Sequence, residues 1–216
     1  MYNVVNTHFD FMKKIILTLA LVAAAATSAF AQFGIGAGYA NNNQKVGENS
    51  SATNGFFVEG TYSIPVAGEF SIVPGVRYTY LGETTSAATN IAGINIGGSS
   101  TLVEHYLAIP VMAQYGIDLG AAKILAFAGP TFNLGLASQT KVEASVAGIS
   151  ADKPINNYGD NSIYSRTNVF VGGGLGIEIS SFQIKAAYDF GLLNRYNSDN
   201  VTCKDNQFRV GVAYLF

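Results

Sequence analysis

Apolar side chains recur at every second position along most of this chain, and this period of two restricts the folds that it can adopt. In the last ten residues, one face would carry Phe208, Val210, Val212, Tyr214 and Phe216, and the other Gln207, Arg209, Gly211, Ala213 and Leu215. Successive side chains of a β-strand point to opposite faces. The pattern therefore predicts strands rather than helices.

Apolar content is spread through the chain instead of being gathered into one long segment. After residue 31, no stretch approaches the roughly 18 consecutive apolar residues of a membrane-spanning helix. Charged residues make up only 12% of the chain, whereas soluble domains average about 25%. This combination is typical of a barrel that crosses a membrane with strands. The net charge of −2 gives no reason to expect nucleic-acid binding.

Eight segments show the alternation, and most reach the roughly 9 to 11 residues of a tilted membrane strand. They are Phe33–Ala40, Gly55–Ile64, Phe70–Leu81, Leu102–Ile117, Lys123–Leu136, Asn168–Ile179, Phe182–Tyr196 and Gln207–Phe216. We therefore predict an all-β fold. It is a single closed antiparallel transmembrane β-barrel of eight strands in an up-and-down meander.

The charged residues of these segments share one face when the outward face is set from the apolar residues alone. The inward set is Glu59, Arg77, Glu104, Lys123, Glu178, Lys185, Asp189 and Arg209. An Arg or Lys facing lipid at mid-depth would cost roughly 2 to 4 kcal/mol. Four acids and four bases predict a paired network inside the barrel. A soluble β-sandwich would also alternate, but it would turn the charged face to water.

The connections between the predicted strands alternate in length. Residues 41–54, 82–101 and 137–167 are long, residues 65–69, 118–122 and 180–181 are short, and residues 197–206 are intermediate. Outer-membrane barrels have short periplasmic turns and long extracellular loops, and an even strand number places both termini in the periplasm. Asparagine clusters at residues 41–43 and 156–157 predict solvated loops.

The N-terminus has the three parts of a secretory signal peptide. Met12-Lys13-Lys14 is basic, Ile15–Ala26 is apolar, and Ala29-Phe30-Ala31 is an A-x-A cleavage site. We predict cleavage between Ala31 and Gln32, with residues 1–31 as signal peptide and residues 32–216 as the barrel domain. Residues 1–11 fit no part of a signal peptide and indicate a mis-assigned translation start.

Four short motifs resemble the PorT-like outer-membrane β-barrel family of Bacteroidetes, a small barrel of the OmpA/OmpX type. They are Tyr106-Leu107-Ala108-Ile109-Pro110-Val111, Ala128-Gly129-Pro130-Thr131-Phe132, Gly172-Gly173-Gly174-Leu175-Gly176, and the segment Tyr188–Asn194. They follow the family's order and span most of Gln32–Phe216. The resemblance implies the fold and the outer membrane. It also implies that the terminal aromatic residues Tyr214 and Phe216 are read by the barrel-assembly machinery.

Proline and glycine complicate the predicted strands. Pro74, Pro110 and Pro130 lie inside strands although proline cannot donate to a ladder, so bulges or shifted boundaries are expected. Inward glycines are consistent with curvature or with room for large inward neighbours such as Phe57 and Phe127.

Catalytic and metal-binding patterns are weak. A hydrolase or acyltransferase would need a nucleophile and a base, and His105, the only histidine after residue 31, is expected to face outward. The glycine run at 172–176 fits no G-x-G-x-x-G register. Glu143, Asp152 and Asp160 lack metal-site spacing. The single cysteine, Cys203, is expected to be a free loop thiol. We predict no catalytic residue, cofactor or metal.

The function expected from the sequence is structural. The barrel would sit in outer-membrane lipid, be inserted by the barrel-assembly machinery, and anchor extracellular loops that contact a ligand or an envelope protein. The alternatives are a narrow porin-like conduit and a lipid-modifying enzyme that uses His105.

Overall fold

The computed structural model describes residues 32–91, 94–146, 149–158, 164–196 and 201–216. The predicted signal peptide and Asp160 lie outside these residues. The described part of the chain has no helix long and apolar enough to cross a membrane.

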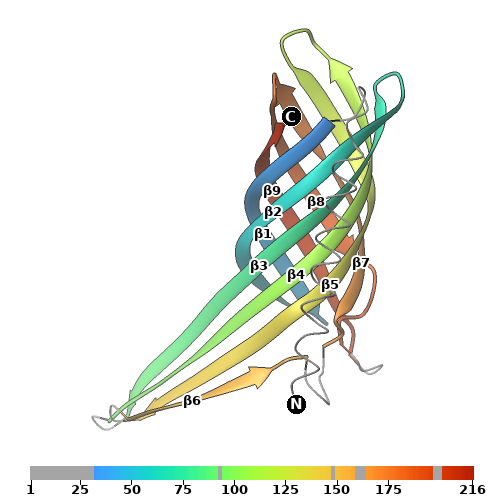
Figure 1. Cartoon of the computed structure of the whole chain (residues 1–216). Coiled ribbons are helices and arrows are strands. Elements are labelled where there is room, and N and C mark those ends of the chain that lie inside the picture. Colours follow the sequence, from blue (N-terminus) through green and yellow to red (C-terminus); the bar gives the residue numbers. More distant parts are fainter. Residues whose placement is uncertain (1–31, 92–93, 147–148, 159–163, 197–200) are drawn as a thin grey trace, which may run out of the picture.

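Eight antiparallel strands close into a ring, as Figure 1 shows. They are β1 (Gln32–Val46), β2 (Asn49–Ala67), β3 (Phe70–Ile91), β4 (Ile94–Asp118), β5 (Lys123–Val146), β7 (Thr167–Ile179), β8 (Phe182–Gly191) and β9 (Cys203–Leu215). Each strand pairs with the next, β5 pairs with β7, and β9 pairs with β1. The predicted eight-stranded antiparallel barrel is confirmed.

The two faces of the ring differ in polarity, and they are inverted relative to a soluble protein. On β8, Gln183, Ala187 and Asp189 are buried in the lumen. The outward residues of the same strand are exposed and apolar: Phe182, Ile184, Tyr188 and Phe190. A soluble β-sandwich would bury its apolar face. The outer surface of this ring is therefore suited to lipid.

The long connections predicted as solvated loops are largely paired strands. β1 and β2 continue to a tight turn in which Gly47 has a φ of +59°. β3 and β4 pair as far as Ile91 and Ile94, and β5 continues into an additional strand, β6 (Ile149–Asn156). The sequence-based boundaries were wrong because the ladder continues outside the membrane, where backbone pairing does not need an apolar face.

The asparagine clusters are also not simply solvated. Asn42 is buried on the inner face of β1. Asn157 is buried and donates hydrogen bonds to Ser138 Oγ at 2.9 Å and Thr140 Oγ1 at 3.0 Å. Asn42 and Asn157 are therefore buried against neighbouring strands and do not mark free loops.

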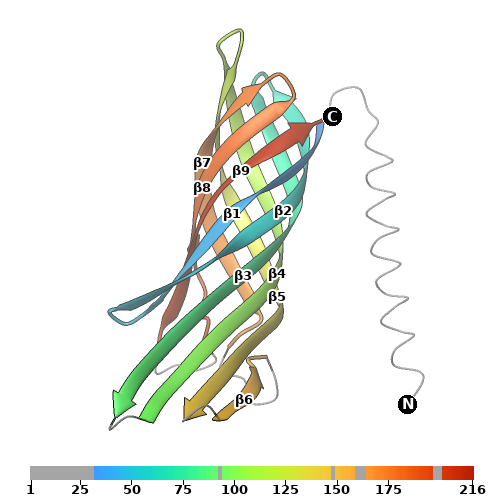
Figure 2. The same cartoon turned by 90° about the vertical axis from the view of Figure 1, so that its left-hand side faces the viewer.

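We define the hairpin sheet as residues 83–91, 94–101, 137–146 and 149–156, the parts of β3, β4, β5 and β6 that leave the ring. Pairing of β2 with β3 extends to Asn54 and Gly82, so within the described residues the outer edge of β3 is free beyond Gly82. The sheet projects from the barrel away from the end at which β1 begins and β9 ends (Figures 1 and 2). We name these the hairpin end and the terminal end.

The three prolines do not produce the expected bulges. The register of β3 with β4 is the same at Pro74–Val111 and Arg77–Ala108, on both sides of the proline. Register shifts occur instead between Pro65 and Ala67 and between His105 and Tyr106. A proline removes one N–H donor, whereas a bulge needs an extra residue in one strand.

Inward glycines make room for aromatic rings. A Cβ on Gly211 would lie 2.7 Å from the Phe57 ring, and one on Gly38 would lie 2.8 Å from the same ring. A Cβ on Gly174 would lie 2.6 Å from the ring of Phe127. Aromatic side chains therefore occupy the space beside these glycines, so the glycines do not leave an open channel.

Candidate functional site

The charged side chains of the lumen form three groups along the barrel axis. The structure places all eight predicted residues on the inner face, but it distributes them among these groups instead of joining them in one network. The first group is the middle cluster of Glu59, Arg77, Lys185, Asp189 and Arg209.

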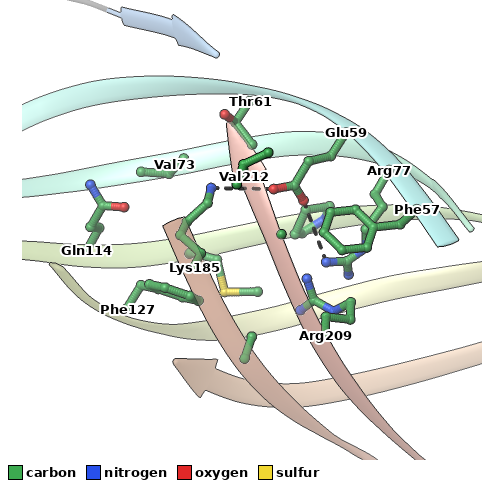
Figure 3. Close-up of a pocket in the computed structure, with 14 residues that line it drawn as sticks. Phe57, Glu59, Thr61, Val73, Arg77, Gln114, Phe127, Lys185, Arg209 and Val212 are labelled. Atoms are coloured by element: carbon green, nitrogen blue, oxygen red, sulfur yellow. Dashed lines mark ion pairs between the residues drawn. The ribbon is translucent and has the colours of Figure 1, made fainter. Parts of the chain in front are cut away.

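Glu59 is shared by two cations of the middle cluster. Its carboxylate lies 3.7 Å from Arg77 Nη1 and 3.4 Å from Lys185 Nζ, and Figure 3 shows the two cations reaching it from β3 and β8. Asp189 Oδ2 accepts hydrogen bonds from Arg209 Nη2 at 2.5 Å and Nε at 3.1 Å. The Arg209 guanidinium also lies 5.9 Å from the centre of the Phe57 ring.

The second group closes the hairpin end and is built around Arg195. Its guanidinium pairs with Glu104 and, at 2.9 Å, with Asp205 Oδ2. The rings of Tyr164 and Tyr106 lie 4.7 and 5.6 Å from it. We name Glu104, Arg195 and Asp205 the hairpin-end cluster. One cation shared by two carboxylates and two rings ties β4, β9 and the connection after β8 together.

Arg195 and Asp205 are absent from the predicted network, although the sequence contained a signal for both. Arg195 has the same parity as Lys185 and Asp189, and Asp205 has the same parity as Arg209. The predicted strand Phe182–Tyr196 was too long, since β8 ends at Gly191. In the connection after β8, the backbone N–H of Arg195 donates to Cys203 O at 2.9 Å, and the Arg195 side chain is buried.

The third group lies at the terminal end and is more open. Lys123 Nζ pairs with Glu69 Oε2 at 2.9 Å, and Gln183 Nε2 donates to Glu178 Oε2 at 2.7 Å. Glu69 was missed because it lies in a turn, where parity does not apply. These side chains line a cavity of about 370 Å³, which we name the terminal vestibule.

The lumen narrows from the terminal vestibule toward the hairpin end. The middle cluster borders a cavity of about 50 Å³. Near Arg195 and Tyr106 the free space falls to about 10 Å³. Tyr164 lies outside the strands and flanks Arg195, and burial raises its pKa to about 12.

The remaining candidates lie outside the lumen network. His105 Nδ1 lies 2.6 Å from the Tyr78 hydroxyl, and its ring packs edge-on against Tyr80. Cys203 is buried at the start of β9, so the prediction of a loop thiol is wrong: its backbone pairs with Val46 of β1. Phe216 packs against Phe33 and Tyr214 on the outer surface.

Glu143 of the hairpin sheet forms a surface ion pair with Lys141. Lys141 Nζ lies 2.7 Å from Glu143 Oε1, and this contact holds the pKa of Glu143 below its usual value. Asp152 of β6 lies opposite Glu143 of β5 in the backbone pairing of the two strands. Among the described residues, no group of three or more His, Cys, Asp or Glu side chains could hold a metal ion.

Residues 23–197 match the model of the family described as "Outer membrane protein beta-barrel domain". The chain belongs to this family. Its apolar outer surface and buried charges therefore face the lipid and the lumen of an outer-membrane protein. The match includes all of the ring except β9 and extends into the predicted signal peptide.

Solved structures of small outer-membrane proteins resemble the chain in part. Ail, the attachment invasion locus protein of Yersinia pestis, is 17% identical, with 87% of this chain and 99% of Ail covered at a TM-score of 0.46. Neisserial surface protein A is 14% identical, with 85% of this chain and 97% of that protein covered at a TM-score of 0.46.

The outer membrane enzyme PagL is 11% identical, with 82% of this chain and 98% of PagL covered at a TM-score of 0.44. No curated protein sequence matches the chain. Resemblances at these scores carry no argument about activity.

Proposed function

We propose that this outer-membrane protein is a non-conducting, non-catalytic anchor that presents the hairpin sheet outside the cell. One observation carries the proposal: β3, β4 and β5 each belong to the ring and continue beyond it into the hairpin sheet. The ring fixes these strands in lipid, and the same backbone ladder holds the projecting part. Both termini would then lie in the periplasm.

The two edges of the hairpin sheet favour contact on the β3 side. The β6 edge contains Pro154, which cannot donate a hydrogen bond to an added strand, whereas the β3 segment Thr84–Ile91 has neither proline nor charge. Unprotected edges present unpaired N–H and C=O groups to other chains. We propose that an extended segment of an extracellular ligand or an envelope protein pairs there.

The closed lumen supports the absence of conduction. An eight-stranded barrel is just wide enough to be filled by its own side chains. Here the middle and hairpin-end clusters are buried and paired, and aromatic rings occupy the space beside inward glycines.

The surroundings of His105 support a non-catalytic role. A histidine that activates a nucleophile needs a hydroxyl, thiol or carboxylate partner in a site that can hold substrate. The Tyr78 hydroxyl lies 2.6 Å from His105 Nδ1, but both residues lie on the outward face of the ring beside Tyr80 and not in a pocket of the lumen. This aromatic group suits the membrane interface, where amphipathic rings collect.

The proposal also includes membership of the PorT-like lineage and recognition of Phe216 by the barrel-assembly machinery.

Paired tag insertions test the orientation. Gly47 and Gly120 lie in turns at opposite ends of the barrel, and a Cβ at either position would meet no atom within 4 Å. An epitope inserted at Gly47 should be labelled on intact cells, and one at Gly120 only after the outer membrane is opened. Labelling of Gly120 on intact cells would invert the model.

Conductance tests the anchor. The purified protein in a planar bilayer should give no steady current. A stable ohmic channel would overturn the anchor and favour the conduit, while a change in lipid A composition on expression of the wild-type chain but not of His105→Ala would favour the enzyme.

A further inference from the structure

The middle cluster carries more positive than negative charge. Three cations, Arg77, Lys185 and Arg209, face two carboxylates, Glu59 and Asp189. Burial of an uncompensated charge is costly. The hairpin-end cluster has the opposite imbalance, but Tyr106 and Phe57 lie between the two clusters and Arg195 uses both carboxylates there.

Arg77 is the least satisfied member of the cluster. Its side chain is only 2% exposed, its contact with Glu59 is long at 3.7 Å, and its Nε–H has no hydrogen-bond partner. Arg77 and Arg209 line the same cavity (Figure 3), and like charges repel each other. Asp189 Oδ1 is also buried without a hydrogen-bond partner, so direct contacts within the protein match the charges of this cluster incompletely.

Free space lies beside these residues. The cavity of about 50 Å³ is lined by Arg77, Lys185 and Arg209, and Glu59 and Phe57 also border it (Figure 3). A water molecule needs about 10 to 15 Å³ of such space. The cavity therefore has room for one monatomic anion, whereas an organic anion such as gluconate is too large.

The cavity is connected to the terminal vestibule. Four residues line both spaces: Thr61, Val73, Gln114 and Lys185. An ion arriving through the open terminal end would pass Lys185, whose side chain is 18% exposed, before it meets Arg77. The hairpin-end cluster closes the path beyond, so a bound ion could not continue through the barrel.

We propose that the middle cluster is a binding site for one halide-sized anion, which lies in this cavity beside Arg77, Lys185 and Arg209 and compensates the third cation. The anion fills the remaining space in the middle of the lumen and thereby stabilises the folded barrel. Ligands that bind only the folded state raise its stability in a saturable, concentration-dependent way.

Halide-dependent unfolding tests the site. The folded protein in detergent is unfolded in urea with chloride, bromide or gluconate as the sodium salt, at constant ionic strength so that general screening is equal. The unfolding midpoint should rise and saturate as chloride or bromide replaces gluconate. In Arg77→Met the halide affinity should fall about tenfold or more, as expected for the loss of a positive charge beside the bound ion.

Two further variants keep the test decisive. Lys185→Met removes a more exposed cation of the same cluster and should also weaken the response, even if Arg77→Met fails to fold. Lys123→Met removes a cation of the terminal vestibule outside the cluster and should leave the response intact. An equal response in all three variants would show non-specific screening and overturn the site.

Bromide anomalous diffraction locates the ion directly. Crystals of the wild-type protein grown with bromide should show a peak between Arg77 and Arg209. Only water in the cavity, combined with a midpoint that does not depend on halide, would overturn the proposal.

Discussion

The ring and the hairpin sheet are built from the same strands, yet they follow different rules. Within the ring, β4 buries Glu104, Tyr106 and Ala108 on one face and turns Ile109 outward. Beyond the ring, the segment Gly97–Ser100 of β4 is partly or fully exposed and carries small or polar side chains. One backbone ladder passes through both regions.

The difference shows that pairing of the backbone and sorting of the side chains are separable. In lipid, every backbone polar group must be paired, and the faces must be divided between lipid and lumen. In water, the ladder can persist without that division. Substitutions should therefore be severe in the ring and mild in the hairpin sheet.

The largest expected effect is that of Arg209→Ala. Asp189 is 1% exposed and accepts both of its hydrogen bonds from Arg209. Removing one partner of a buried pair costs about 3 to 5 kcal/mol. Urea unfolding from detergent measures this loss. As a control, Lys123→Ala breaks a half-exposed pair with Glu69 and should cost less than about 1 kcal/mol. If both variants lost the same free energy of unfolding, buried and exposed charge pairs would not differ in this barrel.

A smaller effect is expected where the segment after the hairpin sheet returns to the ring. A Cβ on Gly135 would lie 2.1 Å from the Tyr158 hydroxyl, and Tyr158 is buried. Gly135→Ala should therefore destabilise the barrel by about 1 to 3 kcal/mol through overpacking. In a Tyr158→Ala background the same substitution should have little effect. If the losses of stability from the two substitutions add in the double variant, the Gly135→Ala strain does not come from contact with Tyr158.

Shortening the hairpin sheet should change stability little. Thr85 and Ser100 are partners across β3 and β4, so residues 86–99 can be replaced by a two-residue turn without altering the register. The variant should keep the wild-type urea midpoint but lose contact with a surface partner. A large drop in midpoint would show that the projecting ladder supports the ring.

The smallest effect concerns the exposed pair of Lys141 and Glu143. Their contact lowers the pKa of Glu143, so its stabilisation is present above the ordinary carboxyl pKa and is lost as the pH falls through the lowered one. Lys141→Ala should move the Glu143 titration, followed by NMR, toward the ordinary value without a measurable change in midpoint. A clear loss of stability would show that the pair contributes more than its solvent exposure allows.

The fold could be predicted from the sequence because the membrane enforces the period of two. Parity placed Arg77, Asp189 and Arg209 on the inner face, and the structure has them there. Parity does not give depth, so it could not tell which charges meet: Glu104 lies with Arg195 and not with the middle cluster.

Turns and projecting strands were harder to predict than the ring. Glu69 lies in a turn, and Tyr158 follows β6 where no periodic signal remains. The segment Thr84–Thr89 reads as a loop because serine, threonine and alanine show no apolar alternation. Its pairing with β4 depends on the neighbouring strand, which a local pattern does not contain.

Because the register of β3 and β4 is continuous, the number of paired residues sets how far the hairpin sheet projects from the ring. From Gly82 to Ile91 the pair extends nine residues past the last contact with β2, or about 30 Å at the usual rise per residue. Removing two residues from each strand would lower the tip by about 7 Å and keep the same faces, whereas removing one would turn every side chain over. The height of a surface contact above the membrane can therefore change only in steps of two residues.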